Sequence, residues 1–166
     1  MATEPKPTLI AEQILARLAA IRGDQGETYW YTPVVVRSEG PDERLLDTSL
    51  ETVYALTPDR KEERRATNDG PGCIIDARAF FTLTLLGQCR TPTTNPFVNT
   101  GITRDVIQER MKADASKALR SDANLGGVSI DLTITETEEG PPTFVEGWAM
   151  VLMRLMVRYH YAKEAA

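Results

Sequence analysis

Residues 147–161 read GWAMVLMRLMVRYHY, and this stretch decides the fold. A helix would bring together one set of its apolar residues: Trp148, Val151, Leu152, Leu155, Met156 and Tyr159. A strand would instead place alternate residues from Ala149 to Tyr159 on one face. Composition fits both assignments. The stretch follows Gly140-Pro141-Pro142, a tight turn of the kind that joins two strands of a hairpin, and this position favours a strand.

The segment before that turn predicts the partner strand. Residues 128–137 alternate between apolar and polar side chains, which is typical of a half-buried strand. The face expected to be buried carries Val128, Ile130, Leu132 and Ile134. We therefore expect the chain to end in an antiparallel hairpin.

Two segments have the apolar spacing of amphipathic helices. The first runs from an N-cap at Thr8 to about Ile21, and its inward residues are Ile10, Ile14, Leu18 and Ile21. The second covers 104–120 after a cap at Thr103, and its inward residues are Ile107, Met111, Ala115, Ala118 and Leu119. Residues 1–7, with two prolines, predict a flexible N-terminal tail.

Three further strands are expected, at 29–37, at 52–57 (closed by Pro58) and at 79–88, the last with a possible start at Cys73. Long polar loops are predicted at 39–50, 57–72 and 91–102. The predicted fold is α+β, with a mostly antiparallel sheet of four to five strands and two helices packed on one face. Residues 8–162 would form a single domain.

Composition narrows the classes of function. The 166 residues are 42% hydrophobic and 26% charged, near the average for globular proteins. A net charge of −5 argues against avid nonspecific phosphate binding. We find neither a signal peptide nor an apolar stretch long enough to span a membrane, so synthesis in a reducing cytoplasm and no membrane association are expected. Cys73 and Cys89 are interpreted as buried structural thiols.

Motifs for catalysis and cofactor binding are not found, so we predict no catalytic residue, cofactor site or metal site. His160 is the only histidine, and we expect it near the end of a strand. The pairs Glu62/Glu63 and Glu138/Glu139 lie in charged or turn segments, where solvated surface is the simpler interpretation. The segment Asp122, Leu125, Gly126 and Gly127 predicts a backbone turn in which glycine supplies positive φ.

Two charged segments leave alternatives open. Arg60, Lys61, Arg64 and Arg65 enclose Glu62 and Glu63, which fits a solvated loop, a partner-binding loop or a nucleic-acid contact. From Ser121 to Met153 there are six acids and no Lys or Arg. This is either a solvated hairpin or a negative surface that, repeated by symmetry, would repel phosphate.

Three segments together resemble the tail terminator family of long-tailed bacteriophages, also called tail completion or minor tail proteins. IAEQILARLAAI (10–21) is similar to the family's opening helix. DVIQERMKADASKALRSDANLGG (105–127) resembles its second helix and Asp-x-x-Leu-Gly-Gly turn. Residues 147–159 resemble its closing strand, ending in Val-x-Tyr. The resemblance spans roughly 8–162 and departs from simpler members at 39–72 and 150–156.

The resemblance implies a homohexameric ring in the virion, at the head-proximal end of the tail, made in the bacterial cytoplasm. Such a ring binds the tail tube protein on one side and the head-tail connector protein on the other, and it stops tube growth. DNA passes through it without specific binding. Under this hypothesis Glu136, Glu138 and Glu139 would line the channel, and Arg60, Lys61, Arg64 and Arg65 would form a partner-binding loop.

The sequence is also compatible with two other functions. A connector or head-completion ring of the same particle would have a similar fold, and tail length in particles lacking the protein separates the two. A small enzyme or nucleic-acid-binding domain is the more remote alternative. A monomer that binds a DNA probe at physiological salt would favour it.

Overall fold

The computed structural model describes residues 5–24, 26–38, 52–65, 73–89, 104–121, 124–140 and 147–162. Within these ranges the chain forms two α-helices, one 3-10 turn and a five-stranded sheet. The helices and the turn are α1 (Lys6–Ala19), α2 (Arg104–Arg120) and η2 (Leu125–Gly127). The strands are β1 (Val34–Arg37), β2 (Thr52–Arg65), β3 (Ile74–Gln88), β4 (Asp131–Gly140) and β5 (Trp148–Ala162).

The strands lie in the order β1-β2-β3-β5-β4. The β1–β2 pair is parallel, and the other three pairs are antiparallel. β3 and β5 pair along their whole length, from Ile74 opposite Ala162 to Gln88 opposite Trp148. The assignment of the final apolar run as a strand is therefore confirmed, and so is the mostly antiparallel α+β fold.

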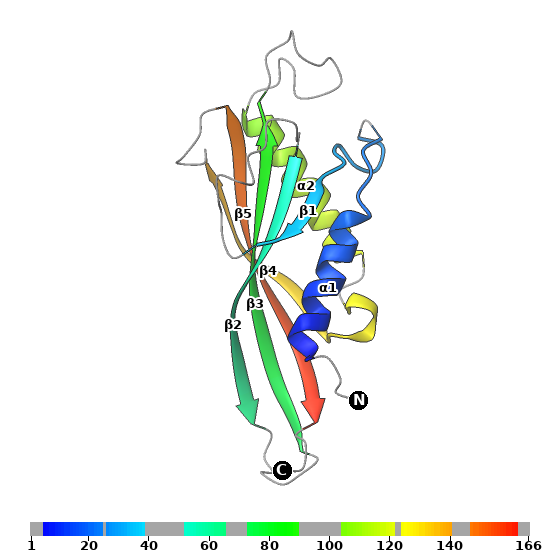
Figure 1. Ribbon diagram of the computed structural model, residues 1–166, viewed down its shortest axis with the longest axis vertical. Helices are drawn as coiled ribbons and strands as arrows, with labels where there is room; N and C mark the ends of the chain where they lie inside the picture. Colours follow the sequence, from blue (N-terminus) through cyan, green and yellow to red (C-terminus); the bar gives the residue numbers. More distant parts are fainter. Residues whose placement is uncertain are drawn as a thin grey trace.

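Both helices pack on the same face of the sheet (Figure 1), as predicted. The inward residues of α1 and α2 meet alternate residues of the two central strands, because successive side chains of a strand point to opposite faces. On β5 these buried residues are Ala149, Val151, Met153, Leu155, Val157 and Tyr159. On β3 they are Ala77, Ala79, Phe81, Leu83 and Leu85. Below the helices in Figure 1, β2, β3 and β5 continue as a three-stranded arm.

The prediction of a loop at 57–72 is wrong for residues 57–65, which continue β2. Pro58 was expected to end the strand because it cannot donate a backbone hydrogen bond. In the structure it lies at a register shift between Pro58 and Lys61, just past the end of β1. A strand edge or bulge is where proline is tolerated, and pairing with β3 then resumes as far as Arg65.

Several element boundaries also differ from the prediction. α1 begins at Lys6 after Pro5 rather than at Thr8, because Pro7 in the first turn has no intrahelical donor to lose. The predicted strand 29–37 is confirmed only for Val34–Arg37. β4 is shifted from 128–137 to Asp131–Gly140, so Ile130, expected to be buried, is 40% exposed.

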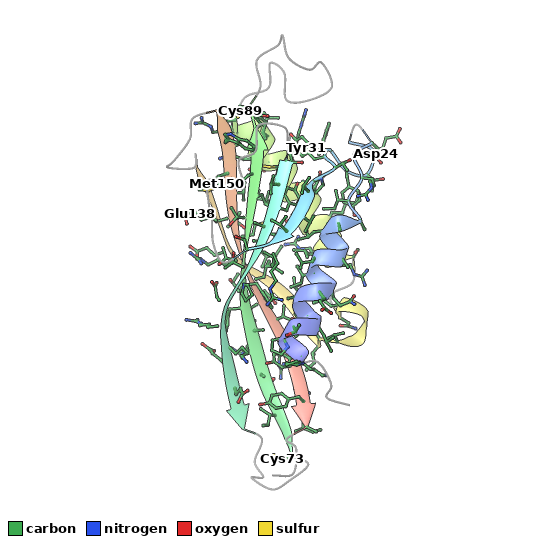
Figure 2. All side chains as sticks on the ribbon, viewed as in Figure 1. Asp24, Tyr31, Cys73, Cys89, Glu138 and Met150 are labelled. Carbon is green, nitrogen blue, oxygen red and sulfur yellow. The ribbon has the colours of Figure 1, made fainter. Side chains whose placement is uncertain are left out.

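Some predictions fall on other parts of the chain. The loops at 39–50 and 91–102, residues 66–72, Asp122 and residues 1–4 lie outside the described residues. Cys73 and Cys89 are free and half-buried rather than fully buried. They flank β3 at opposite ends (Figure 2), which keeps them from forming a disulfide with each other.

A buried carboxylate of α2 holds the segment between α1 and β1. Asp114 is 2% exposed, and it accepts the backbone N–H groups of Trp30 and Tyr31 at 2.9–3.0 Å. Burial raises the pKa of Asp114, while these two N–H groups act in the opposite direction. The segment 29–33 is thus fixed by a side chain about 80 residues away in sequence rather than by strand pairing.

Replacing Asp114 by alanine should destabilise the protein by about 1–3 kcal/mol, because two N–H groups lose their acceptor near the core. Asp24→Ala is the matched control, since Asp24 also accepts backbone N–H groups, from Thr28 and Tyr29, but is exposed. We expect a smaller loss for the control in urea denaturation. Equal losses would show that the burial of the Asp114 contacts adds nothing.

Gly87 of β3 lies against α2, with no room for a larger side chain. A Cβ atom built there would be 2.9 Å from both Ile107 Cγ2 and Met111 Sδ. Gly87→Ala should therefore destabilise the protein by about 1–3 kcal/mol through overpacking. Gly140→Ala is the control, because a Cβ there meets no atom within 4 Å. Thermal denaturation that leaves Gly87→Ala as stable as Gly140→Ala would contradict this packing.

Candidate interaction surfaces

The three candidate channel-lining acids do not share one face of the sheet. Glu136 and Glu138 pair with Arg154 and Leu152 of β5, on the face opposite the two helices. We call it the helix-free face, because neither helix of the described residues lies on it. Glu139 pairs with buried Val151 and points toward α2. Strand alternation separates Glu139 from Glu136 and Glu138, and the register shift between Ile134 and Glu136 decides that Glu139 is the one that faces α2. A surface formed by all three acids is therefore not present in one chain.

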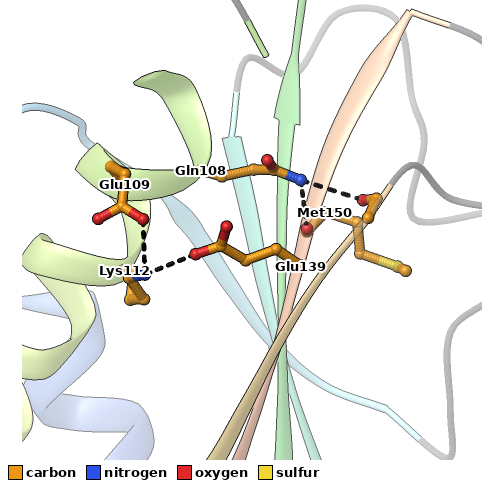
Figure 3. A network of polar contacts seen from close by, with 6 residues as sticks. Gln108, Glu109, Lys112, Glu139 and Met150 are labelled. Carbon is orange, nitrogen blue, oxygen red and sulfur yellow. Dashed lines mark hydrogen bonds and ion pairs between the residues drawn. The ribbon is translucent and has the colours of Figure 1, made fainter. Parts of the chain in front are cut away.

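Glu139 belongs to a polar network between α2 and the β4–β5 hairpin (Figure 3). Lys112 Nζ lies 2.7 Å from Glu109 Oε1 and 2.5 Å from Glu139 Oε1. These two carboxylates raise the pKa of Lys112. Beside them, Gln108 Nε2 donates to the carbonyl oxygens of Met150 at 3.0 Å and Gly140 at 3.3 Å. Glu139 thus attaches the hairpin to α2 and is not free for another partner.

The other two acids are exposed on β4. Glu136 lies 3.3 Å from Arg154 Nε, in a pair whose side chains are 62% and 47% exposed. Such an exposed pair stabilises the fold only slightly. Glu138 projects from the strand on the side away from the helices (Figure 2). It has no hydrogen bond or ion pair with another described residue.

The predicted basic loop is the outer edge of β2. The Arg60 guanidinium lies 4.6 Å from the centre of the Phe80 ring and 3.5 Å from Glu62. Lys61 is exposed and has no ion pair within the described part of the chain. Arg64 and Arg65 lie in the same strand. All four expected cations thus belong to β2 and not to a free loop.

A hollow of about 230 Å³ opens beside this edge, and we call it the β2 notch. It exists because β1 stops at Arg37 while β2 continues past its register shift. The lining residues are Arg37 of β1, Pro58, Asp59, Arg60 and Lys61 of β2, Ala79, Phe80 and Phe81 of β3, and Pro7 and Thr8 of α1. The notch combines three cations and one acid with an apolar floor.

The Leu-Gly-Gly segment is a structural turn. Leu125, Gly126 and Gly127 have φ values of 49°, 71° and 88°, a conformation that favours glycine. The Leu125 side chain is fully buried in the main core. The prediction that glycine supplies positive φ here is confirmed.

The helix-free face carries an ion-pair cluster that the sequence did not predict. Arg158 donates to both carboxylate oxygens of Asp76 at 3.1 and 3.2 Å, and His160 Nε2 lies 3.5 Å from the same carboxylate. The Arg158 hydrogen bonds lower the pKa of Asp76. The available signal was the alternation in β5, which places Arg154, Arg158 and His160 on one face once a strand is assumed.

The upper part of the same face is apolar. Val53, Leu86 and Trp148 are buried there in a second small cluster, with Val36 and Met150 packed against it. The helix-free face therefore changes along the strands from an apolar end to a charged end. Its cross-strand contacts stabilise the sheet independently of the helices.

Among the described residues, no group of three or more His, Cys, Asp or Glu side chains is placed to hold a metal ion. In the same part of the chain, no helix is long and apolar enough to cross a membrane. The exposed polar features of the described residues are the charged edges of β2 and β4 and the charged end of the helix-free face.

Comparison with protein-family models and with curated proteins gives no match for this chain. The candidate surfaces are extended, and their charged groups lie along strand edges.

Proposed function

We propose that this chain is a virion structural protein that forms a ring on the end of a phage tail tube, stops tube growth and joins the tail to the head. The observation that carries the proposal is the order of elements. The opening helix, the second helix with its Leu-Gly-Gly turn and the closing strand of the resemblance correspond to α1, α2–η2 and β5. The α+β architecture is the one that the resemblance implies.

The shape of the subunit supports the same role. The helices cover only one face of the sheet, and a three-stranded arm extends past them (Figure 1). A ring subunit needs separate surfaces for its two neighbours, for the tube below and for the connector above. The helix-free face, the arm, and the β2 and β4 edges supply such surfaces, and function follows from surface complementarity rather than from catalysis.

The exposed acids suit a channel that DNA crosses without binding. Glu136 and Glu138 lie on the helix-free face, and a ring would repeat them in each copy. Repeated carboxylates repel phosphate groups and keep the duplex from adhering. Glu139 is left out of this role, because its carboxylate is held by Lys112.

Particles assembled without this chain test the function directly. Loss of a tail-capping ring should give tubes longer than the wild-type length in electron micrographs, since nothing stops polymerisation. Complementation with the wild-type chain should restore one uniform length. Free tails of normal length beside filled heads would instead assign the chain to the head side of the joint. Normal particles would contradict both structural roles.

A further inference from the structure

β5 presents two arginines on the helix-free face, Arg154 and Arg158, and each is held by a carboxylate of a neighbouring strand. Arg154 Nε lies 3.3 Å from Glu136 Oε2 of β4. Arg158 donates to both carboxylate oxygens of Asp76 of β3, at 3.1 and 3.2 Å. The second pair has the two-point geometry in which a guanidinium also binds a phosphate group. β5 thus carries cations on the face that would meet DNA, and neighbouring strands neutralise them.

Asp76 lies among three basic residues of the arm, Arg78, Arg158 and His160, which we call the arm cluster. It is opposite His160 in the β3–β5 ladder, and His160 Nε2 is 3.5 Å from the carboxylate. In the next row Arg78 lies opposite Arg158, a like-charged pair that is unfavourable unless an acid is near. The hydrogen bonds from Arg158 lower the pKa of Asp76, and His160 and Arg78 act in the same direction. One charged carboxylate therefore serves the whole cluster.

Two other acids of this face are less well placed to neutralise the arm cluster. Glu62 of β2 lies opposite Arg78, but its carboxylate is 3.5 Å from another arginine of β2. Asp131 of β4 lies opposite Arg158 in the β4–β5 ladder, and the two side chains form no hydrogen bond with each other. Asp76 raises the pKa of Arg158 more than Asp131 does. The arm cluster therefore depends chiefly on Asp76.

We propose that the Asp76 carboxylate takes the position in the arm cluster that a DNA phosphate would otherwise occupy. Because both of its oxygens accept from Arg158, the Nε edge of that guanidinium is not available to a phosphate group. Asp76 is a positioning residue here, since it acts by holding basic groups rather than by touching DNA. The inference rests on the proposed function, because it concerns the face that would meet DNA in the channel.

Asp76→Asn tests this inference, because it removes the charge and keeps the shape of the side chain. Binding of the purified chain to a labelled duplex DNA fragment would be followed by fluorescence anisotropy over a range of salt concentrations. The wild-type chain should bind weakly. Asp76→Asn should bind at least about threefold more tightly at low salt. Its slope of log K against log salt should be steeper by about one for each cation that reaches a phosphate.

Asp131→Asn is the matched control, since it makes the same change of charge beside Arg158 without removing a hydrogen bond from it. We expect a much smaller gain in DNA affinity for this control. Asp76→Asn combined with Arg158→Gln should return the affinity close to that of the wild type, because the freed guanidinium is gone. Asp76→Glu, which keeps the charge, should bind as weakly as the wild type. Circular dichroism verifies that each variant is folded.

Three outcomes would overturn the inference. These are Asp76→Asn that binds DNA no more tightly than the wild type, an equal gain for Asp131→Asn, and a gain that persists when Arg158→Gln is added. Tail length in particles lacking the chain is a separate readout. Overlong tails with no gain in DNA binding would keep the capping function and reject the role of Asp76. A gain by Asp76→Asn together with tails of normal length would support the role of Asp76 and count against the capping function.

Discussion

The pairing of β3 with β5 is the constraint on which the rest of the structure depends. Fifteen residues of each strand lie opposite one another without a register shift, from Ile74 and Ala162 to Gln88 and Trp148. This register fixes which side chains form the floor of the core, and so where α1 and α2 can pack. It also fixes where the neighbouring strands β2 and β4 pair with this central pair. Each of these two strands has one register shift of its own.

The register shifts in β2 and β4 determine which side chains are exposed at the two sides of the sheet. The shift in β2 at Pro58 and Lys61 opens a cationic notch beside the end of β1. The shift in β4 after Ile134 turns Glu139 toward α2 and places Glu136 and Glu138 on the helix-free face. The β3–β5 ladder is continuous, whereas β2 and β4 each contain one bulge. The exposed side chains of β2 and β4 therefore differ in charge.

The sequence predicted what depends on local pattern. The apolar stripe at 104–120 predicts α2 correctly, and the tight turn before residue 147 favours the strand found in β5. Alternation within β5 also identified its buried face. These signals succeed because each is set by neighbours close in the chain or by burial on one side.

The missed features depend on distant residues. β2 continues past Pro58 because β3 is available to pair with it, which no local propensity could indicate. Segment 29–33 has β-forming residues but is held by Asp114 instead. The bulge in β4 reassigns Glu139, and the cluster of Asp76 with Arg158 requires the β3–β5 register. In each of these cases the structure depends on tertiary contacts, which the local sequence pattern does not contain.

The assignment of a capping ring is tested most directly by imaging the purified chain on tail tubes. Tubes isolated from particles that lack the chain would be mixed with it, supplied with free tube protein and examined by negative-stain electron microscopy. We expect an added ring at one end of each tube and no further growth there. Tubes that stay bare and continue to lengthen with the chain in excess would contradict the assignment.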